Sequence, residues 1–260
     1  MDPIQASDLA LADGIELMAG WQTHHRTDRS PELLMTAGAS RFPTPYSNAV
    51  LPLQAAPPEE LFNRAGAFFN DRRCVLWTQV ERDRGLIESA QQRGYLALGE
   101  VPAMVIEARV SPSELPSALS IEDVSTSAGL AELVHVCQEA YAEVGLPAEI
   151  GAKLLASTDA VLDGRATLAL ARFDGKAIGA ALSLVTAANA LGGVYWVATL
   201  PSERRKGAAD AVTRFVTNAA FDRGARIVTL QASRAGEPIY RRMGYREAVR
   251  YERLLSPRAS

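Results

Sequence analysis

Hydrophobic positions follow two different periods along the C-terminal half of the chain. Short continuous or alternating apolar runs predict strands, and stretches in which apolar side chains recur every three or four residues predict helices. By this criterion we expect strands at residues 120–124, 166–173, 177–185, 190–199, 227–232 and 245–254. We expect helices at residues 127–142, 147–155, 207–223 and 237–243. The resulting order, β-α-α-β-β-β-α-β-α-β, predicts an α/β domain with a mixed sheet.

Local signals support several of these boundaries. Asp174-Gly175 lies between two apolar runs and predicts a tight hairpin turn. Ser127 is placed to cap the first helix, and Pro147 fits the first turn of the second. Gly224 and Gly244 follow the last two helices, where glycine commonly ends a helix in the left-handed conformation.

The N-terminal part of the chain is less regular. We expect helices at residues 8–27, 59–72 and 84–93, strands at 33–39, 48–53 and 74–80, and an apolar stretch that extends to residue 106. The segment 107–118 is rich in proline and serine and has little periodicity, which predicts a linker. We therefore expect two domains, at residues 1–112 and 113–260.

An internal repeat connects the two parts. The segment 75–95 (VLWTQ…GLIESAQQRGY) resembles the segment 227–245 (IVTLQ…GEPIYRRMGY). Both segments predict a strand, a short helix, a Gly-Tyr pair and a second strand. This repetition predicts two copies of one fold, of which the first has decayed.

Composition and charge narrow the class of protein. The chain has 260 residues, of which 48% are hydrophobic and 22% charged, as is usual for soluble globular proteins. Its formal net charge of -3 gives no case for a nucleic-acid partner and only slightly favours a cationic one. No apolar run is long enough to cross a bilayer, and the acidic start is unlike a signal peptide. We expect a cytoplasmic protein without a membrane partner.

The two cysteines and the adjacent histidines carry no predicted chemistry. Cys74 and Cys137 lie far apart in the chain, so we expect two buried thiols rather than a disulfide. His24-His25 has no cysteine or carboxylate cluster nearby, so we expect no metal site.

The segment 197–209, V-A-T-L-P-S-E-R-R-K-G-A-A, carries the clearest chemical signal. A predicted strand ends there, and a helix begins after three cations and Gly207. The first N–H groups of a helix have no partners within the helix and lie at the positive end of its dipole, so they bind phosphates. Glycine and alanine at this position let an anion approach the backbone. The alternative is an exposed basic loop without a ligand.

Two motifs together resemble a known family. R-R-K-G-A-A at 204–209 resembles the Arg/Gln-x-x-Gly-x-Gly/Ala signature of the GCN5-related N-acetyltransferases, the GNAT superfamily. The run Q-A-S…I-Y-R-R-M-G-Y that ends at Tyr245 resembles a second segment of that family. The resemblance covers residues 118–255. It implies the acyl-CoA N-acyltransferase (GNAT) fold, a mixed α/β (α+β) sheet, with a degenerate GNAT-like domain before it in tandem.

The resemblance implies a site for acetyl-CoA as co-substrate, in the second domain only. Pantetheine is expected in the gap between the fourth and fifth strands of that domain, against backbone groups of the fourth strand. The expected cofactor-binding residues are Val197, Ala198, Thr199, Arg204, Arg205, Lys206, Gly207, Ala208, Ala209, Ser233 and Tyr240. Ser233 stands where many relatives have an asparagine.

The resemblance also implies catalytic roles. The N–H of Val197 is expected to stabilise the oxyanion, and Tyr240 to protonate the departing thiolate as general acid. The alternative for Tyr240 is a packing role. Tyr141, Glu143 and Trp196 are the candidates for contact with the acceptor.

The general base is not evident, because the strand G-G-V-Y-W-V-A-T has no carboxylate. Glu143 could reach the site, and so could Glu203 in the turn before the helix, or an ordered water and backbone carbonyls could serve.

The predicted reaction is acetyl transfer from acetyl-CoA to a primary amine of a small molecule or peptide, by direct attack in a ternary complex. Two alternatives stay open: a non-catalytic acyl-CoA-binding sensor, and an interaction module that binds no cofactor. The chain is expected to be a monomer or a homodimer.

Overall fold

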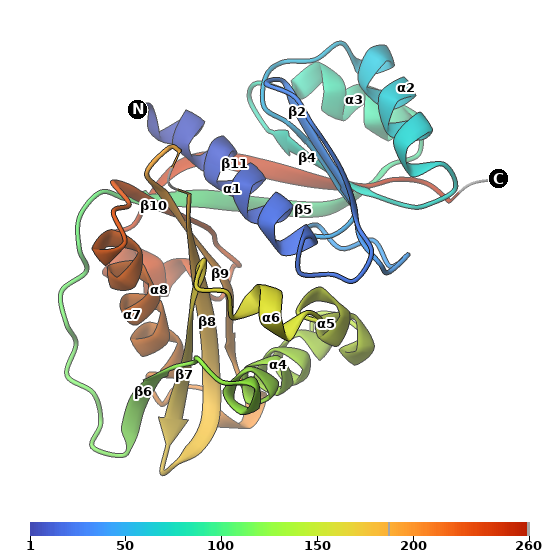
Figure 1. The fold of residues 1–260 in the computed structure, drawn as a ribbon. Helices are drawn as coiled ribbons and strands as arrows, with labels where there is room; N and C mark the ends of the chain where they lie inside the picture. The colour runs from blue at the N-terminus through green and yellow to red at the C-terminus, as the bar shows by residue number, and fades with distance from the viewer. Residues whose placement is uncertain (187, 259–260) are drawn as a thin grey trace.

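The computed structural model describes residues 1–186 and 188–258. A single sheet of 11 strands, in the order β1-β2-β3-β4-β11-β5-β10-β9-β8-β7-β6, runs through the whole molecule (Figure 1). Its strands are β1 (Arg26–Arg29), β2 (Leu33–Ala37), β3 (Ala49–Pro52), β4 (Val75–Gln79), β5 (Leu96–Ile106), β6 (Leu119–Asp123), β7 (Ala166–Phe173), β8 (Lys176–Thr186), β9 (Leu191–Thr199), β10 (Ile227–Gln231) and β11 (Arg246–Leu255). The helices are α1 (Pro3–Ala19), α2 (Pro58–Phe69), α3 (Arg84–Gln92), α4 (Ser127–Ala142), α5 (Ala148–Leu154), α6 (Thr158–Val161), α7 (Ala208–Asp222) and α8 (Glu237–Arg242).

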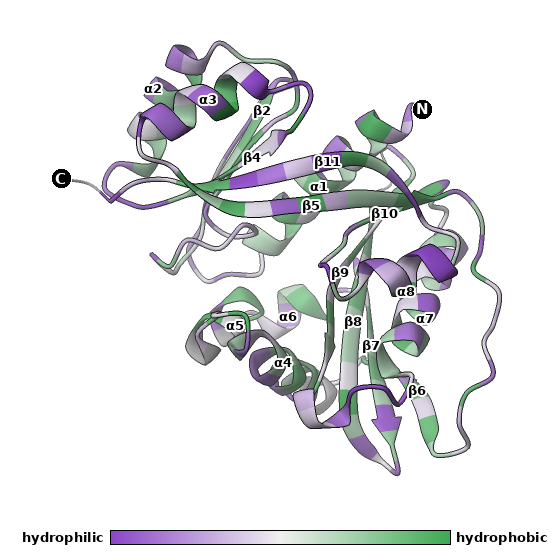
Figure 2. Ribbon diagram, turned by 180° about the vertical axis from the view of Figure 1, so that it is seen from behind, coloured by the Kyte–Doolittle hydropathy of each residue, from purple (hydrophilic) through white to green (hydrophobic). Residues whose placement is uncertain are grey.

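We call the part from α1 to β5 the N-terminal half and the part from β6 to β11 the C-terminal half. In the C-terminal half, α7 and α8 cover one face of the sheet and α4, α5 and α6 cover the other (Figure 1). Strands β7 and β8 between these layers are largely hydrophobic, whereas α3, α7 and α8 also carry hydrophilic residues (Figure 2). The apolar stripe of each helix therefore faces the sheet, as burial of apolar surface requires.

The last strand of each half crosses into the other half. β5 pairs with β10 on one side and with β11 on the other, and all these pairs are antiparallel. β11 in turn pairs with β4 of the N-terminal half. The crossing strands make the two halves parts of one continuous sheet (Figure 1).

Helix α1 packs across both halves of the sheet. The hydroxyl of Tyr195 on β9 donates to the carbonyl of Ala10 in α1 at 2.7 Å. A Cβ at Gly14 would lie 2.2 Å from that hydroxyl oxygen, and a Cβ at Gly193 would lie 2.3 Å from it. Two glycines are therefore required for the close approach of α1 to β9.

The two copies of the internal repeat have the same backbone geometry after their helices. Gly94 after α3 and Gly244 after α8 both adopt the left-handed conformation, with φ of 79° and 99°. The N–H of Tyr95 donates to the carbonyl of Ala90 at 3.0 Å, and that of Tyr245 donates to the carbonyl of Tyr240 at 3.0 Å. Ala90 therefore occupies the place in the N-terminal half that Tyr240 occupies in the C-terminal half.

The expected helix at 8–27 is wrong in its bounds. α1 starts at Pro3 and ends before Gly20, and Arg26–Arg29 forms the strand β1 instead. Because β1 is a mostly exposed, polar edge strand, it has no apolar alternation that the sequence could reveal.

The cap of α4 is also corrected. Thr126, not Ser127, accepts the N–H of Gly129 at 3.1 Å. The short helix α6 was not expected from the sequence. The segment 107–118 holds no helix or strand, and Asp174 and Gly175 both have positive φ in the β7–β8 hairpin, as expected.

Candidate active site

A gap opens between β9 and β10. The two strands run parallel, but only Ile227, Val228 and Thr229 of β10 pair with β9, opposite Leu191, Gly192 and Gly193. β9 continues to Thr199, whereas the rest of β10 pairs with β5 on its other side. The C-terminal part of β9 therefore presents one edge without a partner strand.

A bulge lies in that part of β9. Ala180 pairs with Ala198 and Leu182 with Tyr195, so Trp196 and Val197 together face Ala181 and have no partner of their own in the β8–β9 ladder. Trp196 has a φ of 55°, which is rare for a bulky residue. Bulges of this kind redirect backbone groups away from the ladder, and they recur next to active sites.

Helix α4 fixes the carbonyls of the bulge. The hydroxyl of Tyr141 donates to the carbonyl of Val197 at 3.1 Å, and the thiol of Cys137 approaches that of Trp196 at 3.8 Å. The rings of Tyr141 and Trp196 meet edge to face, with centroids 5.3 Å apart. Trp196 also donates its indole N–H to the sulfur of Met18 in α1. The predicted acceptor residues Tyr141 and Trp196 thus lie together at the bulge.

Tyr240 is held on α8 by its contact with Gly236. A Cβ at Gly236 would lie 2.8 Å from the Tyr240 ring, so only glycine permits this position of the ring. Burial, and then the nearby hydroxyl of Tyr46, raise the pKa of Tyr240. The pKa of Tyr141 is likewise raised by burial, then by Cys137, Tyr240 and Tyr46. The phenol of Tyr240 therefore keeps its proton at neutral pH, as a general acid must.

The turn that leads into α7 has the geometry of an anion site. Arg205 and Gly207 have positive φ, of 68° and 85°. Gly207 is the N-cap of α7, and because it has no side chain, no capping bond occupies the first N–H groups of the helix. The first N–H groups of α7, from Ala208 and Ala209, are thus at the end where a phosphate binds.

The three cations of the turn differ in their partners. Lys206 binds Glu203 at 2.7 Å and lies over the Phe173 ring, 4.3 Å from its centroid. Lys176 binds the same carboxylate, and the two lysines lower the pKa of Glu203 to about 2.

Arg204 forms an ion pair with Glu143 at the surface. Arg205 is exposed and forms no ion pair with the residues that the structure describes. Of the three cations of the turn, only Arg205 has no ion pair with the described residues.

Two other predicted residues have other partners. The hydroxyl of Ser233 accepts the N–H of Gly236, the residue that directly precedes α8, at 3.1 Å. Glu143 is exposed and bound to Arg204, which does not favour a role as general base. Thr199, in contrast, has a buried hydroxyl oxygen that lacks a partner among the described residues.

Comparison with known proteins agrees with this geometry. Residues 176–248, which include β9, the turn, α7, β10 and α8, match the family model of the acetyltransferase (GNAT) domain. This segment of the chain is therefore similar to a GNAT domain.

Solved structures extend the likeness of fold beyond the GNAT domain. A GCN5-related N-acetyltransferase from Kribbella flavida is 20% identical, with a TM-score of 0.72 over 100% of this chain and 97% of that one. One from Sphaerobacter thermophilus is 16% identical, with a TM-score of 0.62 over 100% and 96%. A putative acetyltransferase of the GNAT family from Novosphingobium aromaticivorans is 15% identical, with a TM-score of 0.60 over 100% of both chains. A search of curated proteins finds no match. The whole chain therefore has the GNAT fold.

Two residues without a role predicted from the sequence are further candidates for this site. The side-chain amide of Gln231, the last residue of β10, is buried, and neither its oxygen nor its nitrogen has a partner in the described part of the chain. Tyr46, from a loop of the N-terminal half, meets Tyr195 edge to face at 6.1 Å. A polar residue that ends an apolar strand could have pointed to Gln231, whereas no pattern in the sequence marks Tyr46.

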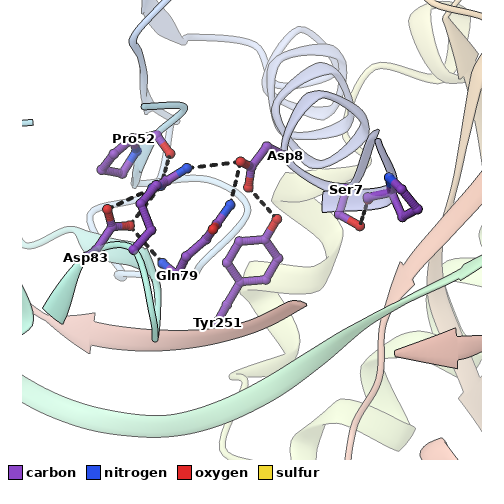
Figure 3. Close-up of polar contacts among 8 residues, drawn as sticks. Ser7, Asp8, Pro52, Gln79, Asp83 and Tyr251 are labelled. Carbon is purple, nitrogen blue, oxygen red and sulfur yellow. Dashed lines mark hydrogen bonds and ion pairs between the residues drawn. The ribbon is translucent and has the colours of Figure 1, made fainter. Parts of the chain in front are cut away.

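A polar network bridges the corresponding gap of the N-terminal half, which we call the closed gap (Figure 3), and it borders a surface pocket lined by Asp8, Gln79 and Arg82. β3 and β4 are parallel and pair only at Ala49–Val75 and Val50–Leu76. Arg82 donates to the carbonyl of Pro52 at 2.8 Å and binds Asp8 at 3.0 Å and Asp83 at 2.8 Å. One guanidinium thus connects the end of β3, helix α1 and the N-cap of α3.

Asp8 is the second centre of this network (Figure 3). Its carboxylate accepts the side-chain N–H of Gln79 and the hydroxyl of Tyr251, both at 2.6 Å. Burial raises the pKa of Asp8, while the bonds from Tyr251 and Gln79 and the charge of Arg82 oppose that rise. A hydrogen-bonded polar network therefore occupies this gap of the N-terminal half.

Proposed function

We propose that the chain is an N-acetyltransferase that moves the acetyl group of acetyl-CoA to a primary amine by direct attack in a ternary complex. The observation that carries this proposal is the unpaired Trp196–Val197 bulge at the open β9–β10 gap, with a protonated, buried Tyr240 beside Tyr141. A GNAT domain supports acyl transfer in general. The direct mechanism and the amine acceptor are our proposal.

In this mechanism the N–H of Val197 donates to the thioester carbonyl oxygen and stabilises its negative charge. The amine nitrogen attacks the carbonyl carbon, the C–N bond forms, and the C–S bond breaks. The departing thiolate takes the phenolic proton of Tyr240, which solvent later replaces. The surplus proton of the amine passes to a water. We propose that the free amide of Gln231 holds this water, because no carboxylate on β9 can serve as base.

The pyrophosphate of acetyl-CoA is proposed to bind the N-terminus of α7. Gly207, Ala208 and Ala209 supply backbone N–H groups there, and Arg205 supplies an uncommitted charge. Arg204 and Lys206 contribute in this proposal only if a phosphate displaces Glu143 or Glu203. Ala198 and Thr199 are proposed to line the pantetheine channel.

We also infer that residues 1–112 and 113–260 are two copies of the GNAT fold, the first without a site of its own. The equal bonds of Tyr95 and Tyr245 support this inference, as does the pairing of β3 with β4 in the manner of β9 with β10. Arg82 in the gap and Ala90 in place of Tyr240 account for the loss of the first site.

Calorimetric titration with acetyl-CoA tests the binding half of the proposal. We expect micromolar binding, and a loss of at least about 100-fold when Gly207→Glu places a carboxylate at the N-terminus of α7. The matched control is Pro57→Glu at the N-cap of α2, which should leave the affinity unchanged. Absence of binding by the unmodified protein would overturn the proposal.

A release assay for free CoA thiol with a panel of amines tests the catalytic half. One observation favours the second candidate, an acyl-CoA-binding module without activity. The carboxylate of Glu143, a candidate base in the sequence analysis, is bound to Arg204. Thiol release that depends on the amine supports the enzyme. Tight binding without release for any amine supports the module.

A further inference from the structure

The crossing strand β11 carries, beside strand β4 of the N-terminal half, a cation that faces the same side of the sheet as α1. Arg253 of β11 pairs with Trp77 of β4, and its guanidinium carbon lies 5.9 Å from the centroid of the Trp77 ring. Along β11, Arg253 lies two and four residues after Tyr251 and Val249, and both of these residues pack with the α1 residues of the core. Its side chain therefore shares the face on which α1, Trp77 and Tyr251 meet.

Arg253 lacks an anionic partner among the residues that the structure describes. Its one hydrogen bond runs from Nε to the carbonyl of Gly99 at 3.4 Å, which is long. Burial lowers the pKa of its guanidinium, and the nearby Tyr46 partly opposes this. Arg250 on the same strand, in contrast, binds Glu247 at 2.8 Å. A half-buried guanidinium has five donors to satisfy, so an unpaired one is a site for an anion.

Tyr46 connects this cation with the acetyl-transfer site. Its ring lies 5.8 Å from Trp77 and 6.1 Å from Tyr195, measured between centroids, and Tyr195 directly precedes the bulge at Trp196 and Val197. Tyr46 is also one of the residues that pack against the core of both halves. Burial raises the pKa of Tyr46 to about 12, against the effect of Arg253, so its hydroxyl stays protonated and able to donate.

We propose that Arg253 and Tyr46 bind a carboxylate of the acceptor, so that the enzyme acetylates an amine that carries a carboxylate group. This inference rests on the proposed function and names its substrate class. The planar fork of arginine matches a carboxylate, and the tyrosine hydroxyl donates to the same group. The amine end of the acceptor then reaches the bulge at Val197, while its carboxylate stays in the N-terminal half. The degenerate half thus contributes to specificity.

The test measures binding separately from transfer. Linear ω-amino acids of two to six carbons and their primary amides are titrated into the full-length protein saturated with CoA. At the best chain length we expect the acid to bind about 10- to 100-fold more tightly than its amide, as for a charge-assisted pair. Arg253→Gln should abolish this preference and Tyr46→Phe should reduce it. Arg253→Lys should restore part of it, and the control Arg250→Gln should keep it.

Two results of the binding titrations overturn the inference: equal affinities of acid and amide at every length, or a preference for the acid that survives Arg253→Gln. Acetyl transfer is followed in parallel with acetyl-CoA. Transfer to amides as efficient as transfer to acids contradicts the inference and leaves the proposed function intact. A preference that depends on Arg253, without transfer, contradicts the proposed function and leaves the carboxylate site intact. Unfolding curves of each variant check that it is folded under the conditions of the titrations.

Discussion

The gap between β3 and β4 and the gap between β9 and β10 have the same strand geometry and opposite contents. In the first, Arg82, Asp8, Asp83 and Gln79 satisfy one another. In the second, the amide of Gln231 and the hydroxyl of Thr199, at the ends of the two strands, are buried without partners among the described residues. Buried polar groups in native proteins are nearly always bonded, so unbonded ones mark a place for water or ligand. The β3–β4 gap therefore contributes to the stability of the fold, whereas the β9–β10 gap has polar groups that a water or ligand can bind.

The helix that follows each gap shows the same contrast. Ala90 and Tyr240 accept equivalent backbone bonds, but only Tyr240 brings a hydroxyl to the gap. In α2 the N-cap is Pro57, with two acidic residues in the first turn, whereas α7 has Gly207 as its N-cap and one acidic residue in its first turn, Asp210, which binds Arg214. Acidic side chains at a helix N-terminus repel a phosphate. Both differences are consistent with our proposal that the N-terminal half has no acyl-CoA site of its own.

The largest expected effect comes from opening the closed gap. Arg82→Leu leaves the carboxylates of Asp8 and Asp83, which are 7% and 1% exposed, without their cation. Loss of one partner from a buried ion pair costs about 3–5 kcal/mol, so we expect the free energy of unfolding to fall by that amount. Denaturant titration followed by circular dichroism measures it.

The matched control is Arg234→Leu, at the exposed position after β10. We expect a change below about 0.5 kcal/mol, as at most surface positions. Equal losses for both variants would mean that the Arg82 network contributes no more than a surface arginine, and the contrast between the gaps would then have no energetic basis.

The second effect concerns turnover. Tyr240→Phe should lower kcat about 100-fold, the lower end of the range for general acid catalysis, and should change the Kd of acetyl-CoA less than twofold. Tyr245→Phe is the control, because its hydroxyl bonds Thr217 in the core at 2.7 Å. It should reduce stability by about 1 kcal/mol and leave kcat unchanged. Equal kcat for Tyr240→Phe and the unmodified protein would remove Tyr240 from the mechanism.

The sequence predicted the C-terminal half well because its signals are local. The helix expected at 207–223 is α7 at Ala208–Asp222, and the turn at Asp174-Gly175 is present. The crossing of β5 and β11 between the halves was not predicted. Pairing between strands that lie far apart in the chain leaves no pattern in either strand, so only the structure reveals it.

The residues of the candidate site also differ in whether the sequence could reveal them. Gly207 and Tyr240 could be found because each stands in a short motif on a predicted element. Tyr46 and Arg253 could not, because Tyr46 comes from the half that has no motif and Arg253 lies on the crossing strand β11, outside both motifs. The acidic net charge slightly favoured a cationic acceptor, whereas one unpaired arginine near the site favours an anionic group. Local charge decides binding more strongly than the charge of the whole chain.

The third effect has opposite signs in the two gaps. Gln231→Leu removes an unsatisfied buried amide, so the free energy of unfolding should rise by about 1 kcal/mol while turnover falls. Gln79→Leu removes a donor to Asp8, so stability should fall by about 1–2 kcal/mol and turnover should not change. Thermal or denaturant unfolding and the thiol-release assay measure both quantities. A loss of stability in both variants would show that a partner already satisfies Gln231.

The smallest effect is the pH dependence that Asp8 gives to the closed gap. Burial raises the folded-state pKa of Asp8 above its ordinary value of 3.8, so the folded protein retains a proton that the unfolded chain has lost. The stabilisation from that proton is complete below pH 3.8 and disappears as the pH rises through the folded-state pKa. The free energy of unfolding of the unmodified protein, minus that of Asp8→Asn, should therefore decrease as the pH rises from acid to neutral. Asp71→Asn, at an exposed ion pair, should show no such decrease. A difference that increased with pH would mean that Arg82, Gln79 and Tyr251 outweigh burial, and that the closed gap is optimised for a charged Asp8.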